Sequence, residues 1–138
     1  MGKRIKLGKK KKDKIRGHVI NIPEVKGGTD GEYPVFSFTS CDENRHCLWD
    51  LEHKELKELM SFFKKMGSMS WIDVKQYRSF RWETYDQSEI KNLPKDIPPD
   101  AKIIHLKPSP KFVIFGYRIG QVFYIVWFDR NHKVHNMS

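Results

Sequence analysis

The segment from Lys111 to Asp129 has the most regular hydrophobic pattern of the chain. Two runs of β-branched and aromatic residues flank Gly120-Gln121, which is typical of a β-hairpin closed by a two-residue turn. The register that follows pairs Ile119 with Val122, Tyr117 with Tyr124 and Phe115 with Val126. This hairpin is therefore predicted to form the centre of the fold.

The same register separates the hairpin residues into two faces, because successive side chains of a strand point to opposite sides. The face expected to be core carries no charge and holds Val113, Phe115, Tyr117 and Ile119 against Val122, Tyr124, Val126 and Phe128. The other face is apolar in the middle and charged at its ends, and it holds Ile114, Gly116, Arg118, Phe123, Ile125, Trp127 and Asp129. We expect a functional site on this second face.

Shorter patterns predict the remaining strands. Alternating polar and apolar residues predict strands at 18–25 and 33–39, and a further strand is predicted at 102–107. A short strand at 46–49 is expected to pair back on the one before it, and another at 132–136 is expected to follow the hairpin. Residues 78–95 show no clear period, and we expect a loop or a short helical turn there.

Two helices are predicted between these strands. The first covers residues 51–66, where Leu56, Leu59, Met60 and Phe63 have the spacing of one buried stripe. Asp50 is expected to cap its start and Gly67 its end. Its solvent side is expected to carry Lys54, Lys57, Glu58, Lys64 and Lys65. Ser70 opens a capping box for a short second helix that ends near Tyr77.

This order of elements predicts an α+β fold with a single antiparallel sheet, built around the C-terminal β-hairpin, and two helices on one face. A length of 138 residues suffices for one domain with a core of its own. We expect a disordered basic arm at residues 1–16 and a single α+β domain at residues 17–138.

The charge of the chain is concentrated in that arm. The net charge is +9, and Met1–Arg16 holds nine lysine or arginine residues against one aspartate. Lysine runs of this density attract phosphate, which predicts nucleic acid as the partner. The expected nucleic-acid-binding residues are Lys9, Lys10, Lys11, Lys12, Lys14, Arg16 and Lys133. A solubilising or targeting leader and an anionic membrane surface are the alternatives.

Two cysteines are too few for a disulfide scaffold, and no apolar run is long enough to span a membrane. We therefore expect a cytoplasmic protein with no membrane span. Two groups of residues could suggest a metal site: Asp129, His132 and His135, and Cys41, His46, Cys47 and His53. The first group lies partly on a strand, where residues three apart point to opposite faces, and the second lacks the paired short spacings of a structural zinc site. No metal and no cofactor are therefore predicted.

The ending Phe115 to His135, FGYRIGQVFYIVWFDRNHKVH, resembles a known family. It is similar to the C-terminus of a little-characterised family of small prokaryotic proteins, often from mobile elements. That family shares a pattern of Gly-Tyr-Arg, Phe-Tyr, Trp-Phe-Asp and His-Lys-Val. At a further remove, an arginine in an aromatic hairpin resembles the RelE and HigB type of ribosome-dependent mRNA-cleaving toxin. That resemblance implies RNA or the ribosome as partner and a cognate inhibitor protein.

Metal-independent RNA cleavage of the RelE kind requires a base, a cation for the transition state and a proton donor. Arg118 is the candidate cation, and Tyr124 or Tyr117 the candidate stacking or acid group. His132 and His135 are the candidate general acid and base, because histidine titrates near neutral pH. The alternative is that Arg118 is an ordinary exposed side chain beside a turn and that both tyrosines belong to the core.

A second function hypothesis comes from a different class of protein. The chain could be a non-enzymatic module that binds a protein partner through its sheet, with the basic arm adding nonspecific affinity for nucleic acid. On the enzymatic hypothesis, Arg118, His132 and His135 should converge on one cleft.

Overall fold

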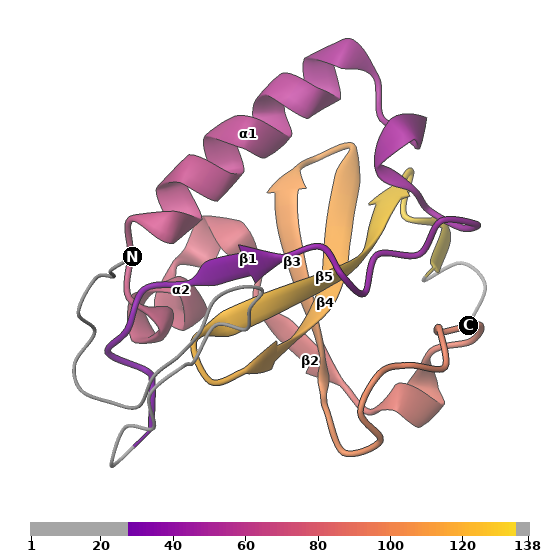
Figure 1. Cartoon of the computed structure of the whole chain (residues 1–138). Coiled ribbons are helices and arrows are strands. Elements are labelled where there is room, and N and C mark those ends of the chain that lie inside the picture. The colour runs from indigo at the N-terminus through magenta and orange to yellow at the C-terminus, as the bar shows by residue number, and fades with distance from the viewer. Residues whose placement is uncertain (1–27, 135–138) are drawn as a thin grey trace, which may run out of the picture.

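Three consecutive strands near the C-terminus, each seven to nine residues long, form the centre of a five-stranded sheet (Figure 1). The structure is a computed structural model and describes residues 28–134, so the predicted arm at 1–16 and the predicted strand at 18–25 lie outside it. The elements follow in the order β1 (Val35–Ser37), η1 (Leu48–Asp50), α1 (His53–Gly67), α2 (Trp71–Gln76), η2 (Arg78–Phe80), β2 (Glu83–Tyr85), η3 (Gln87–Glu89), β3 (Ile103–Ser109), β4 (Phe112–Ile119) and β5 (Val122–Arg130), where η denotes a short 3₁₀ helix.

The α+β class is confirmed, but the sheet is mixed rather than purely antiparallel. Its strand order is β1-β5-β4-β3-β2. The last four strands in this order pair antiparallel, whereas β1 pairs parallel with β5. Figure 1 shows α1 and α2 on one face of this sheet. Because both helices separate β1 from the other strands in the chain, hairpin pairing does not set its direction.

The β4–β5 hairpin has the predicted register near its turn and a different one beyond it. Ile119 pairs with Val122 and Tyr117 with Tyr124, as expected. The register then shifts next to Gly116, so Phe115 pairs with Trp127 and not with Val126. One extra residue in β5 forms a bulge, and a bulge reverses the facing of every residue after it.

Both faces of the sheet are buried, and the helices cover the face that we expected to carry a site. Ile114, Phe123 and Ile125 pack beneath α1 and α2 in the larger core. Beyond the bulge, Phe128 joins them instead of the opposite face. Val113, Phe115 and Tyr117 are also buried, but in a second core with residues of the segment after β2. The hairpin is thus apolar on both sides because it is the middle layer of the fold.

Helix α1 exists where it was predicted, but it presents a different side to the sheet. Its buried residues are Glu55, Leu59, Phe62 and Met66. Of the predicted stripe, Leu56 is 38% exposed and Met60 is 59% exposed. Helical periodicity shows where apolar residues form a stripe. It cannot show that Glu55 is also buried, because that burial depends on an arginine partner elsewhere in the chain.

Several local predictions have mixed outcomes. The Ser70 hydroxyl caps α2 and accepts a hydrogen bond from the amide of Asp73, which is one of the two bonds of the predicted capping box. The N-cap of α1 is Glu52 and not Asp50, and Gly67 is its last residue rather than the cap. Only 35–37 of the strand predicted at 33–39 is a strand.

Three further predictions of secondary structure were wrong. The segment predicted as a strand at 46–49 enters the 3₁₀ helix η1. The short strand β2 was missed, because it has little hydrophobic pattern and is held by its pairing with β3. In place of a strand at 132–136, the described residues there form a turn and begin a helical segment.

Candidate nucleic-acid interface

A groove of about 540 Å³ lies beside α1, between this helix, the segment around η2 and the end of β3. Four lysines line it, against one acidic side chain. Its lining residues are Lys54, Lys57, Glu58, Ser61, Phe62, Lys65, Tyr77, Ser79, Phe80, Lys107 and Pro108. A concave surface with this charge attracts an anionic ligand.

The sequence of α1 explains one wall of the groove. Lys54, Glu58, Ser61 and Lys65 are spaced by four, three and four residues, which places them on one side of a helix. The sequence pattern assigned Lys54, Lys57, Glu58 and Lys65 to the solvent side of the helix. It did not show that this side faces a groove, because the opposite wall comes from distant segments of the chain.

The opposite wall depends on the end of β3. Strand β2 pairs only with 103–105, so the following part of β3, with Lys107 and Pro108, has no β2 partner on that side. Pro108 has no amide hydrogen to offer a further strand. The side chain of Lys107 thereby reaches the groove from the sheet.

Aromatic side chains form the floor of the groove. The rings of Tyr77 and Phe80 lie 4.6 Å apart between centroids, and those of Phe62 and Phe80 lie 4.8 Å apart. Phe62 and Phe80 are buried, whereas Tyr77 is half-buried and keeps part of its ring accessible. The Lys65 ammonium lies 5.0 Å from the centre of the Tyr77 ring. Aromatic rings beside cations are the groups on which single-stranded nucleic acids stack their bases.

Glu58 is unusual among the residues of the groove. It is the one acid among the described lining residues, and its Oε1 is buried without a hydrogen-bond partner in residues 28–134. Buried polar atoms are nearly always paired in folded proteins. The groove is therefore lined by four lysines and one acidic residue, whose Oε1 atom is not exposed.

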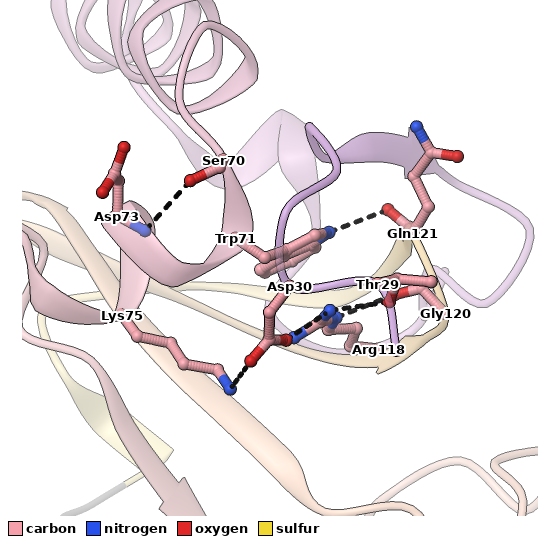
Figure 2. Close-up of polar contacts among 9 residues, drawn as sticks. All are labelled: Thr29, Asp30, Ser70, Trp71, Asp73, Lys75, Arg118, Gly120 and Gln121. Carbon is pink, nitrogen blue, oxygen red and sulfur yellow. Dashed lines mark hydrogen bonds and ion pairs between the residues drawn. The ribbon is translucent and has the colours of Figure 1, made fainter. Parts of the chain in front are cut away.

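Arg118, the predicted catalytic cation, has a different environment (Figure 2). Its guanidinium carbon lies 4.3 Å from the centre of the Trp71 ring. The same group donates to Gly120 O at 2.7 Å and to Thr29 Oγ1 at 2.8 Å, and it pairs with Asp30 at 2.9 Å. The hydrogen bond from Arg118, followed by that from Lys75, holds the pKa of Asp30 below its ordinary value. Arg118 thus clamps residues 29–30 and α2 against the hairpin turn.

We expect the Arg118→Ala variant to lose about 2 kcal/mol of unfolding free energy, because charge-assisted hydrogen bonds and a cation–π contact disappear together. Thermal or urea unfolding of this variant, beside the exposed-site variant Arg45→Ala, measures the effect. Equal stability of the two variants would contradict a clamping role.

The structure does not bring the described candidate catalytic residues together. His132 follows the far end of β5, where its Nε2 lies 3.0 Å from the carbonyl of Pro110. From there to Arg118 the hairpin extends roughly 20 Å. Tyr124 is half-buried and stacks on Tyr117 with centroids 4.9 Å apart, while the Tyr117 hydroxyl contacts Ser40 Oγ at 2.7 Å.

The remaining predicted site residues divide into two groups. Lys133 is exposed at the His132 end of the hairpin, and its backbone amide donates to Asp129. The other predicted residues lie outside the described range: Lys9, Lys10, Lys11, Lys12, Lys14, Arg16 and His135. Within residues 28–134, no three histidine, cysteine or acidic side chains are grouped so as to hold a metal ion.

No family model, no curated protein and no solved structure matches this chain. Among residues 28–134, no helix has the length and apolar character needed to cross a bilayer.

Proposed function

We propose that this protein is a nucleic-acid-directed protein that binds single-stranded RNA in the lysine groove beside α1. The observation that carries the proposal is the placement of four lysines around an accessible tyrosine ring. The lysines would pair with phosphates of the backbone, and the Tyr77 ring would stack on a base. The basic arm would add nonspecific affinity for the same polyanion.

The groove fits a single strand better than a duplex. Stacking on Tyr77 requires a base whose face is free, and bases in a duplex are already stacked on their neighbours. The lysines approach from both walls, so they can contact successive phosphates of a strand lying along the groove. The proposed ligand is therefore an unpaired segment, as found in messenger RNA or in loops of ribosomal RNA.

We expect the double variant Lys57→Gln/Lys65→Gln to bind labelled single-stranded RNA about tenfold more weakly than the wild type at moderate salt. Each phosphate contact to a single strand contributes about 0.7 to the slope of log affinity against log salt, so this slope should fall by about 1.4. Fluorescence anisotropy across a salt series measures both quantities. The unfolding free energy should change little, because both side chains are exposed.

The matched control is Lys91→Gln/Lys95→Gln, which removes the same charge from exposed positions that do not line the groove. Equal loss of affinity in both double variants would show that only net charge matters, which contradicts a groove site. Repeating the assay with Lys9, Lys10, Lys11 and Lys12 replaced by serine separates the arm from the domain. If that replacement abolishes all binding, the arm carries the affinity and the groove proposal fails.

RNA cleavage of the RelE and HigB kind, with ribosome association and a cognate inhibitor, is the sharper form of this proposal. Its support is the resemblance of the C-terminal segment. Because Arg118 and His132 lie at opposite ends of the hairpin, one active site could contain only one of the two. Running the labelled RNA on a denaturing gel after the binding assay distinguishes the two forms. Shorter products require cleavage, whereas intact RNA restricts the function to binding.

A protein-interaction module remains the second candidate, and one observation favours it. Strand β1 is an edge strand, and apolar side chains near it are exposed: Val35 is 48% exposed and Phe38 is 54% exposed. An edge strand with apolar neighbours can accept a strand from another protein. RNA affinity that is unchanged in the Lys57→Gln/Lys65→Gln variant would favour this second function over the first.

A further inference from the structure

We propose that one side of the domain binds an anionic membrane surface, with apolar side chains entering the lipid interface and lysines contacting the headgroups. The inference goes beyond the proposed function, because this surface uses a different side of α1 from the lysine groove. Its basis is a set of exposed large apolar side chains in and around α1, which we call the apolar strip: Phe38, Leu48, Trp49, Leu56 and Met60.

The α1 part of the apolar strip consists of Leu56 and Met60. These residues are one helical turn apart, so they share a side of the helix, and both are exposed. Positions two residues apart in a helix lie on nearly opposite sides, which separates Leu56 from Lys54 and Glu58 of the groove. The helix therefore has a groove side and a separate apolar side.

The apolar strip continues from α1 to the end of β1. The ring of Phe63, three residues after Met60, lies 6.3 Å from the ring of Phe38 between centroids. Phe38 directly follows β1, and Figure 1 shows β1 next to α1. Apolar groups of the helix and of the sheet edge are thus exposed close together, which marks an interaction surface in a soluble protein.

Trp49 is the most exposed residue of the apolar strip. It lies in η1, four residues before the start of α1, and it is 69% exposed, whereas Trp71 and Trp127 have no exposed surface. Tryptophan is enriched where a bilayer meets water, because its ring is apolar and its N–H group is polar. Its exposure beside α1 is therefore suited to a lipid interface.

Lysines accompany the apolar side chains on α1. Lys57 precedes Met60 by three residues and Lys64 follows it by four, so both are its neighbours on the helix surface, and both are exposed. Lys57 also lines the groove, whereas Lys64 does not. Positive charge around an apolar surface is complementary to anionic headgroups.

The acidic residues near Trp49 are held by contacts within the fold. Glu52 pairs with Arg130 at 2.7 Å, and Asp50 accepts a hydrogen bond from the Cys47 amide at 3.0 Å. The sequence Met1–Arg16 adds nine lysine or arginine residues against one aspartate. A polybasic segment and a small apolar insertion each bind membranes weakly, but together they give stable attachment.

The aliphatic members of the apolar strip favour lipid over RNA as the ligand. Leu56 and Met60 have no ring on which a base could stack, whereas insertion into a lipid interface requires only apolar surface. The lysine groove and the apolar strip are therefore expected to bind different ligands.

The test uses the full chain with vesicles of phosphatidylcholine alone and of phosphatidylcholine with about 30% phosphatidylserine. We expect co-sedimentation to show at least about tenfold tighter binding to the anionic vesicles. Tryptophan emission should shift to shorter wavelength on binding, and the shift reports on Trp49 because Trp71 and Trp127 are already buried. In Leu56→Ser/Met60→Ser, we expect affinity for the anionic vesicles to fall about tenfold or more.

The matched control is Ile72→Ser/Ile119→Ser, which removes two exposed apolar side chains outside the apolar strip and should keep the wild-type affinity. Absence of vesicle binding, an unshifted emission, or equal vesicle affinity of the wild type and Leu56→Ser/Met60→Ser would overturn the inference. Self-association of the wild type without lipid, lost in Leu56→Ser/Met60→Ser, would identify a second copy of the chain as the partner and overturn it as well.

Failure of this inference is separate from failure of the proposed function. Leu56→Ser/Met60→Ser should bind single-stranded RNA as the wild type does, because neither residue lines the groove. Loss of RNA affinity in this variant would show that both ligands use one surface, which contradicts a separate membrane site.

Discussion

Replacing Gly116 by alanine is expected to lower the unfolding free energy by about 3 kcal/mol or more, since overpacking a rigid core is costly. A Cβ atom at this position would lie 2.3 Å from the carbonyl oxygen of Tyr124 and 2.7 Å from the ring of Phe123. The first is a backbone atom of the paired strand, and the second belongs to a side chain with no exposed surface. Neither can move without opening the centre of the sheet.

Urea unfolding of Gly116→Ala beside Gly31→Ala measures this effect. Gly31 has open space where its Cβ would lie, so its replacement should change the unfolding free energy by no more than about 1 kcal/mol. Equal stability of Gly116→Ala and Gly31→Ala would show that a Cβ atom fits at position 116. That result would contradict the close approach of β5 to β4 beside the bulge.

Removal of the Glu55 side chain is expected to cost on the order of 3 kcal/mol, the lower end of the range for breaking a buried ion pair. Glu55 is 4% exposed, accepts two hydrogen bonds from Arg130 at 2.8 and 3.1 Å, and accepts another from the Glu52 amide at 2.8 Å. The lower end applies because Arg130 is partly exposed and also pairs with Glu52. Chemical unfolding of Glu55→Ala beside Glu43→Ala, a change at an exposed position, measures the difference.

The same carboxylate makes stability depend on pH. Burial by itself raises the pKa of Glu55, but the hydrogen bonds from the Glu52 amide and Arg130 outweigh it, so the pKa lies below the ordinary value of 4.5. A lowered pKa means that the contribution is present above about 4.5 and is lost as the pH falls through the folded-state pKa. Glu55→Gln should therefore lose less stability than the wild type on acidification below that value. If the wild type and Glu55→Gln lost the same unfolding free energy on acidification, the lowered pKa of Glu55 would be contradicted.

The parts of the fold that the sequence predicted correctly depend on neighbouring residues in the chain. The hairpin turn at 120–121, the presence of α1 and the Ser70 cap of α2 follow from turn chemistry, periodicity and capping within a few residues. The bulge next to Gly116 has no such local signal. It accommodates the packing of Phe123 against Gly116, a contact between two strands.

The candidate site shows the same division. Lysine spacing on α1 identified a polar helix side, and the tetralysine arm indicated an anionic partner. The groove could not be predicted, because its walls come from α1, the η2 segment and the end of β3, which meet only in the folded protein. The role of Arg118 was not visible either, since its partners Asp30 and Trp71 are both remote from it in sequence.

The sequence by itself determined the α+β class, the central hairpin and the concentration of charge at the N-terminus, because these depend on composition and short-range pattern. Only the tertiary structure decided the parallel pairing of β1, the side of α1 that faces the sheet and the groove beside α1. Those features result from contacts between residues far apart in the chain. Such contacts are selected by how the whole core packs, and no local pattern encodes them.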